Sequence, residues 1–432
     1  MKNKKLFYGW IITACCMISV TGASLVSSGL STTLNAMRQE LGFTNTQTGL
    51  VLTIRSISAF FAALVSAKYF EKLGIRMGMV VAMLFGAFTF LLFHIGGANL
   101  LIVYAGAVLS GICYSYGMML PASMLLHNWF NKSRGVALSI ASAGTAVVSM
   151  VFAPVIQSMV NESGIFSAYR MIIVVFIAIA IIDFLFIRET PEKLGLEIYG
   201  GKDYKHEQDG KNVEPREATA LSGGWLIGIV IATVCTGFAA SPYAANFTNH
   251  YVSAGIDTMA VAKAISIYGT VLIISKLVFG VVVDKIGTYK TTILYGYMCM
   301  LAIAVAASVA LFPRVPLMYA GLLLSAIFAS IQTMGYPNWI VDLDSQHYNK
   351  TISKCQTGYQ FGAVVGSFIP GVIADITGNY GIGFALMALA MGISTTLAIG
   401  AYRSQTKKRK KKKKNKVWIG DILILLIQRR HS

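Results

Sequence analysis

The sequence has few charged residues. Only 12% of its 432 residues are Asp, Glu, Lys or Arg, whereas soluble domains contain about a quarter. Hydrophobic residues make up 55% of the chain and stand in long continuous runs that do not alternate with polar residues. Because a bilayer admits only helices or closed barrels, and because continuous runs favour helices, we expect an all-α polytopic membrane protein.

The sequence also lacks the residue patterns of an enzyme or of a metal protein. Its six cysteines fall in or beside apolar runs and show no metal-ligand spacing. The histidines His94, His127, His250 and His347 are scattered near the ends of such runs. No phosphate-binding loop is present, which argues against ATP as the energy source. We therefore expect no enzymatic activity, no cofactor and no metal site.

The net charge of +18 is concentrated in particular connections and in the tail. With the N-terminus placed inside, most lysines and arginines fall on the cytoplasmic side, as the positive-inside rule requires. The charge therefore indicates topology, and we expect no nucleic-acid partner. The prediction is a multi-pass protein of a bacterial-type cytoplasmic membrane, with both termini in the cytoplasm.

Twelve apolar runs are long enough to cross a bilayer as helices. A polar stretch divides them six and six, which predicts an N-terminal half (1–188), a cytoplasmic linker (189–224), a C-terminal half (225–403) and a basic cytoplasmic tail (404–432). The predicted spans are about 7–30, 47–67, 77–95, 99–126, 135–160, 169–187, 225–250, 261–283, 290–312, 316–340, 356–376 and 382–402.

A short charged turn recurs at matching places in the two halves. Residues 67–76 follow the second predicted span, and residues 280–290 follow the eighth. Each segment contains an acid, a base, a glycine and a further base, and such charges can cap and cross-link helix ends. We interpret both as gating turns, with the residues Glu71, Lys72, Gly74, Arg76, Gly280, Asp284, Lys285, Gly287 and Lys290.

Twelve spans in two halves, with this turn after spans two and eight, resemble the major facilitator superfamily over residues 1 to about 403. The first turn departs mildly from the pattern, with Ala67 in place of the leading glycine. The resemblance implies the major facilitator fold and a secondary active transporter with alternating access. Three motifs are similar to those of the monocarboxylate porters and oxalate/formate antiporters: YGW at 8–10, WFNKSRGVA at 129–137 and RETPEKLGL at 188–196.

Lys276 stands in the middle of a predicted span, roughly 12 Å by helical rise from the end of that span at Asp284. A lysine at this depth costs about a few kcal/mol unless it faces protein, water or an anion. It either holds the anionic group of a substrate, or it snorkels or pairs with a buried carboxylate. No acid lies within one turn of it in the sequence, which favours the substrate. The resemblance also implies a cation here, four residues before Gly280.

The resemblance implies a substrate site near the midplane, between the two halves. Proton-coupled relatives carry an acid one turn before the cation, where this sequence has Leu272, so proton symport and anion exchange both stay open. A second cation of oxalate exchangers corresponds to Gln360, and one cation beside an amide suits a monoanion better than a dianion. Arg55 is either a further anion contact or an outer gate partner, or else an arginine that snorkels outward or pairs with polar groups of the eleventh span. The remaining candidates, which could equally serve packing, are Tyr116, Tyr243, Asn246 and Tyr336.

These observations predict a transporter that moves a small (mono)carboxylate through the membrane, by proton symport or by anion exchange. We expect its partners to be a small organic anion, protons in the case of symport, and membrane lipid, with a monomer as the functional unit. Two alternatives stay open: an exporter of another small solute within the same superfamily, and a transporter-like sensor of an anion.

Overall fold

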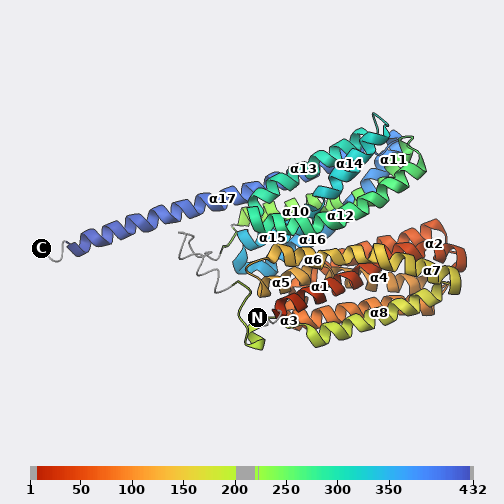
Figure 1. The fold of residues 1–432 in the computed structure, drawn as a ribbon, viewed down its shortest axis with the longest axis horizontal. Coiled ribbons are helices and arrows are strands. Elements are labelled where there is room, and N and C mark those ends of the chain that lie inside the picture. The colour runs from red at the N-terminus through yellow and green to blue at the C-terminus, as the bar shows by residue number, and fades with distance from the viewer. Residues whose placement is uncertain (1–6, 201–218, 222, 429–432) are drawn as a thin grey trace, which may run out of the picture.

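The computed structural model describes residues 7–200, 219–221 and 223–428. Much of the predicted linker (201–218) lies outside the described residues, as do residues 429–432 and the side chains of the tail from 407 onward. The described chain is built from helices that form two groups lying next to each other (Figure 1). We call α1–α8 the N-terminal half and α10–α17 the C-terminal half.

The N-terminal half contains ten helical segments. They are α1 (Tyr8–Ser24), η1 (Leu25–Gly29), α2 (Leu30–Leu41), α3 (Asn45–Gly96), α4 (Leu100–Gly117), α5 (Met119–Trp129), α6 (Arg134–Val147), η2 (Val148–Phe152), α7 (Ala153–Ser163) and α8 (Ile165–Phe186). A short helix, η3 (Pro191–Leu194), follows them. The C-terminal half contains α10 (Gly223–Ala245), α11 (Phe247–Ser253), α12 (Thr258–Ile286), α13 (Thr288–Ser308), α14 (Val315–Phe328), α15 (Ser330–Leu343), η4 (Ser345–His347), α16 (Tyr348–Thr377) and α17 (Gly381–Gln428).

Eleven stretches of the described residues are long and apolar enough to cross a membrane. One of them, Gln47–Gly96, covers two predicted spans, 47–67 and 77–95. Helix α3 runs through both, with a break at Gly74, where φ is 76° and ψ is 165°. This backbone conformation is accessible almost only to glycine. The predicted all-helical architecture is confirmed. Eleven stretches are found in place of twelve predicted spans because α3 continues through the break at Gly74.

Polar side chains fix where some of these helices begin. Thr44 caps α3: its hydroxyl oxygen accepts a hydrogen bond from the Gln47 amide, and the Gln47 side chain accepts one from the Thr44 amide. Such a reciprocal box satisfies two of the N–H groups that a helix start leaves unpaired. Asn99 caps α4 in a similar way, through its contact with Leu101 N.

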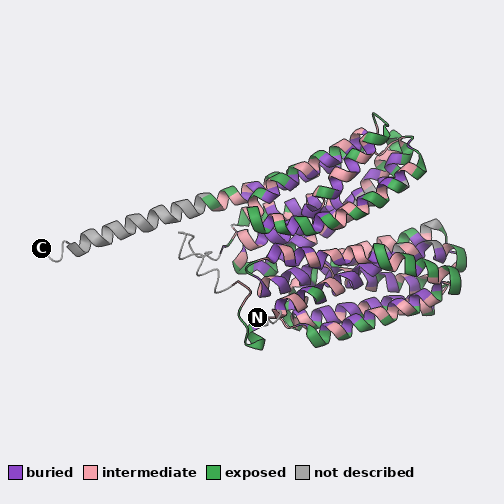
Figure 2. Cartoon of the chain, in the orientation of Figure 1, coloured by how far each residue is buried: buried purple, intermediate pink, exposed green. Residues whose placement is uncertain are grey.

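Each half has helix faces that pack against other helices and helix faces that remain exposed. In the N-terminal half α3 packs against α4 and α8, and α1 against α6; in the C-terminal half α10 packs against α16 and α17. Large apolar side chains such as Leu101, Val174 and Ile376 remain exposed on the outside of the helices, as Figure 2 shows for whole segments. A surface of this kind is favourable against lipid tails.

The two ends of the described chain lie at the same end of the helix bundle. The start of α1 and the extension of α17 beyond the bundle both lie at the end where the loop between α5 and α6 approaches the turn after α12 (Figure 1). The two halves meet through α6 with α12 and through α3 with α16. These two helix pairs carry most of the candidate functional residues.

Candidate functional site

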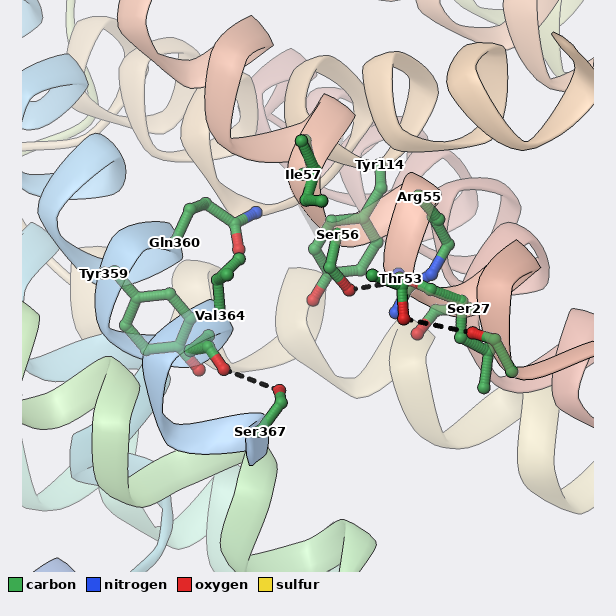
Figure 3. Close-up of a pocket in the computed structure, with 14 residues that line it drawn as sticks. Ser27, Thr53, Arg55, Ser56, Ile57, Tyr114, Tyr359, Gln360, Val364 and Ser367 are labelled. Carbon is green, nitrogen blue, oxygen red and sulfur yellow. Dashed lines mark hydrogen bonds between the residues drawn. The ribbon is translucent and has the colours of Figure 1, made fainter. Parts of the chain in front are cut away.

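A cavity of about 430 Å³ lies between the two halves. The first part of α3, together with η1 and α4, forms one side of it, and α16 forms the other (Figure 3). Among the described residues that line it, Arg55 carries a charge and none is Asp or Glu. Its polar lining residues are Ser27, Thr53, Ser56, Tyr114, Tyr359, Gln360 and Ser367.

Arg55 is held in the cavity wall by an aromatic ring. Its guanidinium carbon lies 5.2 Å from the centroid of the Tyr114 ring on α4, which is the geometry of a cation–π contact. The Nε atom is buried and has no hydrogen-bond partner among the described residues. A guanidinium has five N–H donors, and the ring contact uses none of them. Arg55 is therefore positioned to bind a ligand that accepts hydrogen bonds.

Gln360 lies on the opposite wall, on α16, next to Tyr359 (Figure 3). The residue is only 6% exposed, and Nε2 finds no hydrogen-bond partner in the described part of the chain. A buried donor without a partner is costly. The structure therefore brings together two of the predicted site residues, Arg55 and Gln360, and both present unsatisfied donors.

Lys276 is buried elsewhere, at the contact between α12 and α6. Its ammonium group donates a hydrogen bond to the Thr145 hydroxyl at 2.6 Å and another to the Ser142 carbonyl oxygen at 3.3 Å. It is 7% exposed and does not line the cavity. Its partners are thus a hydroxyl and a carbonyl group of the other half, and no carboxylate pairs with it among the described residues.

The aromatic and amide candidates take different places. The Tyr116 ring stacks on Tyr69 with centroids 4.0 Å apart, and Tyr336 donates a hydrogen bond to the Gln356 side chain. Both side chains therefore contact other parts of their own half. Four predicted candidates do not line this cavity: Tyr116, Tyr243, Asn246 and Tyr336.

The second gating turn joins the two halves. The two carboxylate oxygens of Asp284, on α12, accept hydrogen bonds from the backbone N–H groups of Gly135 at 3.0 Å and Val136 at 3.1 Å. These groups belong to the first turn of α6, where a negative charge also meets the positive end of the helix dipole. A Cβ atom at Gly280 would lie 2.3 Å from the Gly135 carbonyl oxygen. Glycine thus permits the close approach that Asp284 secures.

The first gating turn makes a different set of contacts. Glu71 is exposed, whereas Glu189, which follows α8, reaches the turn and accepts a hydrogen bond from the Arg76 amide at 3.4 Å. Arg76 Nε donates to the Phe184 carbonyl oxygen at 3.0 Å. This turn is therefore tied to its own half, and the two sequence-related turns are not equivalent in the structure.

Two residues of these contacts were not predicted from the sequence. Thr145, the partner of Lys276, is one of many hydroxyl residues in apolar runs, and nothing in the sequence distinguishes it. Tyr359 lines the cavity beside Gln360, and a polar aromatic residue adjacent to a predicted site residue was a signal that could have found it.

The comparisons with known proteins agree with this architecture. The sequence profile of the Major Facilitator Superfamily matches residues 16–304 and 229–430. The crystal structure of the E. coli fucose:proton symporter FucP aligns over 91% of this chain and 99% of its own, with 14% identity and a TM-score of 0.68. The proton:xylose symporter XylE aligns over 90% and 94%, with 12% identity and a TM-score of 0.69.

The human organic anion transporter MFSD10 has the same fold. Its crystal structure aligns over 90% of this chain and 98% of its own, with 10% identity and a TM-score of 0.65. No curated protein sequence matches the chain significantly. Likeness at these identities shows the shared fold and leaves the transported solute to be argued from the cavity.

Proposed function

Because the chain belongs to the Major Facilitator Superfamily, a non-enzymatic family of membrane transporters, it is a multi-pass secondary transporter, and we propose that it moves a small monocarboxylate by alternating access. One observation carries this proposal: among the described residues, the cavity between the halves is lined by Arg55 and by no acidic residue. A fixed positive charge binds a carboxylate through charge-assisted hydrogen bonds, and the Nε–H group of Arg55 has no hydrogen-bond partner among the described residues.

The rest of the cavity wall supports a monoanion. Gln360 and the tyrosines Tyr114 and Tyr359 offer neutral polar groups, which can bind a carboxylate or a hydroxyl group without adding charge. A dianion such as oxalate would need a second cation, and no other lining residue in the described part of the chain is charged. The balance of charges therefore favours lactate or formate over oxalate.

Lys276 belongs to the proposal as a cation outside this cavity that binds the carboxylate in another conformation, in place of Arg55, so that the substrate meets one cation at a time. It is held by Thr145 and Ser142 on the opposite half, through neutral acceptors that a carboxylate could replace. We propose that substrate entering between the halves competes with α6 for this ammonium group. The exchange of partners would connect substrate binding to the contact between α12 and α6.

The conformation of the molecule supports alternating access. Asp284 closes the contact between the halves at the end where both termini lie, and we propose from the positive-inside rule that this end is cytoplasmic. Arg55 lies 16 residues before Glu71 on α3, about 24 Å away by helical rise. The proposed substrate contact is thus well separated from the closed end.

The test is transport in proteoliposomes loaded with unlabelled substrate and supplied with labelled lactate, formate, oxalate or a neutral sugar. We expect saturable exchange of a monocarboxylate that Arg55→Gln abolishes. Arg170→Gln is the matched control, because Arg170 is an exposed arginine of α8 outside the cavity lining. Lys276→Ala should also lower exchange. Transport of the sugar alone, or full carboxylate exchange by Arg55→Gln, would contradict the proposal.

A second condition separates the two modes of coupling. An inward proton gradient stimulates uptake into vesicles without internal substrate only if protons move with the carboxylate. Pure anion exchange requires substrate on both sides and is indifferent to the gradient. Both results agree with carboxylate transport and assign its mechanism.

A further inference from the structure

Asp183 is a fully buried carboxyl group within α8, three residues before the end of the helix at Phe186. Its relative exposure is 0%. Both carboxyl oxygens lie 2.8 Å from the hydroxyl oxygen of Ser19 on α1. No cation forms an ion pair with Asp183 in the described ranges, although ionised carboxylates are almost never buried without one.

The surroundings of Asp183 contain ionisable groups that are turned elsewhere or are ordinarily neutral. The thiols of Cys15 and Cys16 lie on α1 and are buried. Arg76 of α3 donates to the Phe184 carbonyl oxygen and lies over the Phe184 ring, 4.6 Å from its centroid. Arg188, after the helix, donates to main-chain carbonyl groups.

The remaining groups on the elements around α8 lie farther away or bond to main chain. Tyr8 of α1 donates to the Phe186 carbonyl oxygen. The helices α2 and α7 meet α8 near its beginning, where Glu40 accepts a hydrogen bond from Ile165 N. Arg170 precedes Asp183 by 13 residues, about 20 Å along the helix. None of these groups supplies Asp183 with a counter-charge.

The number of protons available for hydrogen bonds indicates whether the Asp183 carboxyl group is protonated. The Ser19 hydroxyl oxygen lies 2.9 Å from the Cys15 carbonyl oxygen and 2.8 Å from the Asp183 oxygens. A hydroxyl group has one proton to donate, and the carbonyl oxygen can only accept. If the carboxyl group is protonated, it donates to Ser19, and Ser19 donates to Cys15. In that chain every proton is donated to an acceptor, and no buried charge remains.

Asp183 differs in this respect from the other buried acid of the described chain, Asp344. Asp344 accepts hydrogen bonds from the Thr351 hydroxyl and from Leu221 N, and it pairs with His347 at 3.2 Å. Asp344 is therefore surrounded by several hydrogen-bonding partners. Asp183 has no comparable support, so a proton is the missing partner.

We propose that Asp183 is the proton-binding site of this transporter, with Ser19 as the residue that positions it. The inference rests on the proposed function and assigns symport as its mode. Protonation forms an O–H bond from a carboxylate oxygen and a proton taken from water. Release breaks that bond, returns the proton to water and leaves a carboxylate to which Ser19 donates instead.

A structural connection links this site to the cavity. Ser19 lies on α1, and α1 continues directly into η1, where Ser27 lines the cavity. The two serines are eight residues apart, about 12 Å along the helix. A shift of α1 and η1 when substrate fills the cavity would move Ser19 away from Asp183. Substrate occupancy and proton release are coupled through this helix.

The test compares two kinds of transport in Asp183→Asn, whose amide is neutral and similar in shape. We expect normal exchange of carboxylate between loaded vesicles and bath, but no stimulation of net uptake by an inward proton gradient. Asp375→Asn, which changes an exposed acid of α16, should keep both activities. Gradient-driven uptake by Asp183→Asn at the wild-type level would overturn the proposal.

Two further measurements keep the proposal testable if a variant fails or if no carboxylate is exchanged. Infrared spectra of the wild-type protein at neutral pH should show a protonated-carboxyl band that is absent from Asp183→Asn, whatever the substrate is. Identical spectra would overturn the proposal. If the wild-type protein exchanges no carboxylate, the proposed function is refuted, but the infrared test of Asp183 remains valid. In Ser19→Ala the pH of half-maximal uptake should rise, and an unchanged pH profile would contradict the positioning role.

Discussion

The ammonium group of Lys276 and the hydroxyl group of Thr145 join the two halves of the transporter through a hydrogen bond of 2.6 Å. Lys276 lies on α12 and Thr145 on α6, so the bond has to break when these helices separate. The buried ammonium group is hydrogen-bonded here by neutral acceptors of the opposite half. These hydrogen bonds replace part of the hydration that the group loses on burial. The pair is therefore a contact that the proposed alternating access would make and break.

Lys276 donates two hydrogen bonds, to Thr145 and to the Ser142 carbonyl oxygen. Replacement of Thr145 by Val removes the shorter one while preserving the shape of the side chain. The buried ammonium group then loses an acceptor, which we expect to destabilise the described conformation by about 1–3 kcal/mol. The midpoint of thermal unfolding in detergent should fall accordingly. Thr89→Val is the control, because in the described part of the chain the buried Thr89 hydroxyl bonds only to the Phe85 carbonyl oxygen of its own helix. Equal shifts in the two variants would refute the special role of Thr145.

The two gating turns are expected to respond differently to loss of charge. Asp284→Asn removes the carboxylate that caps α6, and lost helix caps of this kind cost about 0.5–2 kcal/mol. The closed end should then open more often, which labelling of an engineered cysteine near Gly135 would detect. Glu71→Gln at the matching place of the first turn should leave labelling unchanged, since Glu71 makes no hydrogen bond or ion pair to the described residues.

Two glycines allow the effect of backbone strain on stability to be distinguished from the effect of a steric clash. Gly74 and Gly287 both have a positive φ, 76° and 82°. A Cβ atom at Gly74 would lie 2.3 Å from Glu189 Oε1, whereas one at Gly287 would meet no atom within 4 Å. Both Ala variants carry about 1–3 kcal/mol of backbone strain, and we expect Gly74→Ala to lower the unfolding midpoint further than Gly287→Ala.

The additional loss in Gly74→Ala should disappear when the obstructing side chain is removed. In a Glu189→Ala background, Gly74→Ala should cost about the same as Gly287→Ala, because only the strain remains. If Gly74→Ala costs as little as Gly287→Ala in the original background, Glu189 does not constrain the turn.

The sequence predicted the features that depend on hydropathy and charge along the chain. The spans, the repeated turns and the depth of Lys276 follow from the length of apolar runs and from helical rise. The rotation of each helix and the conformation of the transporter are set by tertiary packing. That is why Arg55 was found in the cavity wall, while Lys276, the stronger candidate by sequence, contacts α6 instead.

The three motifs that carried the finer resemblance also gain a physical explanation. The Trp129 indole donates a hydrogen bond of 2.8 Å to the Arg188 carbonyl oxygen, and its ring lies 5.7 Å from that of Tyr8. Tyr199, beyond the third motif, forms a β-bridge with Phe130. The motifs are far apart in the sequence, so only the fold reveals that they build one contact at the end of the N-terminal half.

The chain after α8 gives this end of the molecule a dependence on pH. Partial burial favours the neutral form of Glu189, but hydrogen bonds from Lys193 and from the Arg76 amide outweigh it, so the pKa of this carboxyl is lowered from its ordinary value of 4.5. A group with a lowered pKa in the folded state stabilises the protein above its unfolded pKa. This contribution is lost as the pH falls through the folded pKa.

We therefore expect Glu189→Gln to unfold at a lower temperature than the wild type at pH 7, and the difference to shrink as the pH falls below about 4.5. Thermal unfolding in detergent from neutral to acid pH measures this difference directly. Glu192→Gln serves as the control, because Glu192 is an exposed acid of the same segment and should give a small, pH-independent difference. A gap between Glu189→Gln and the wild type that stays constant into acid would mean that the Glu189 charge does not hold the first gating turn.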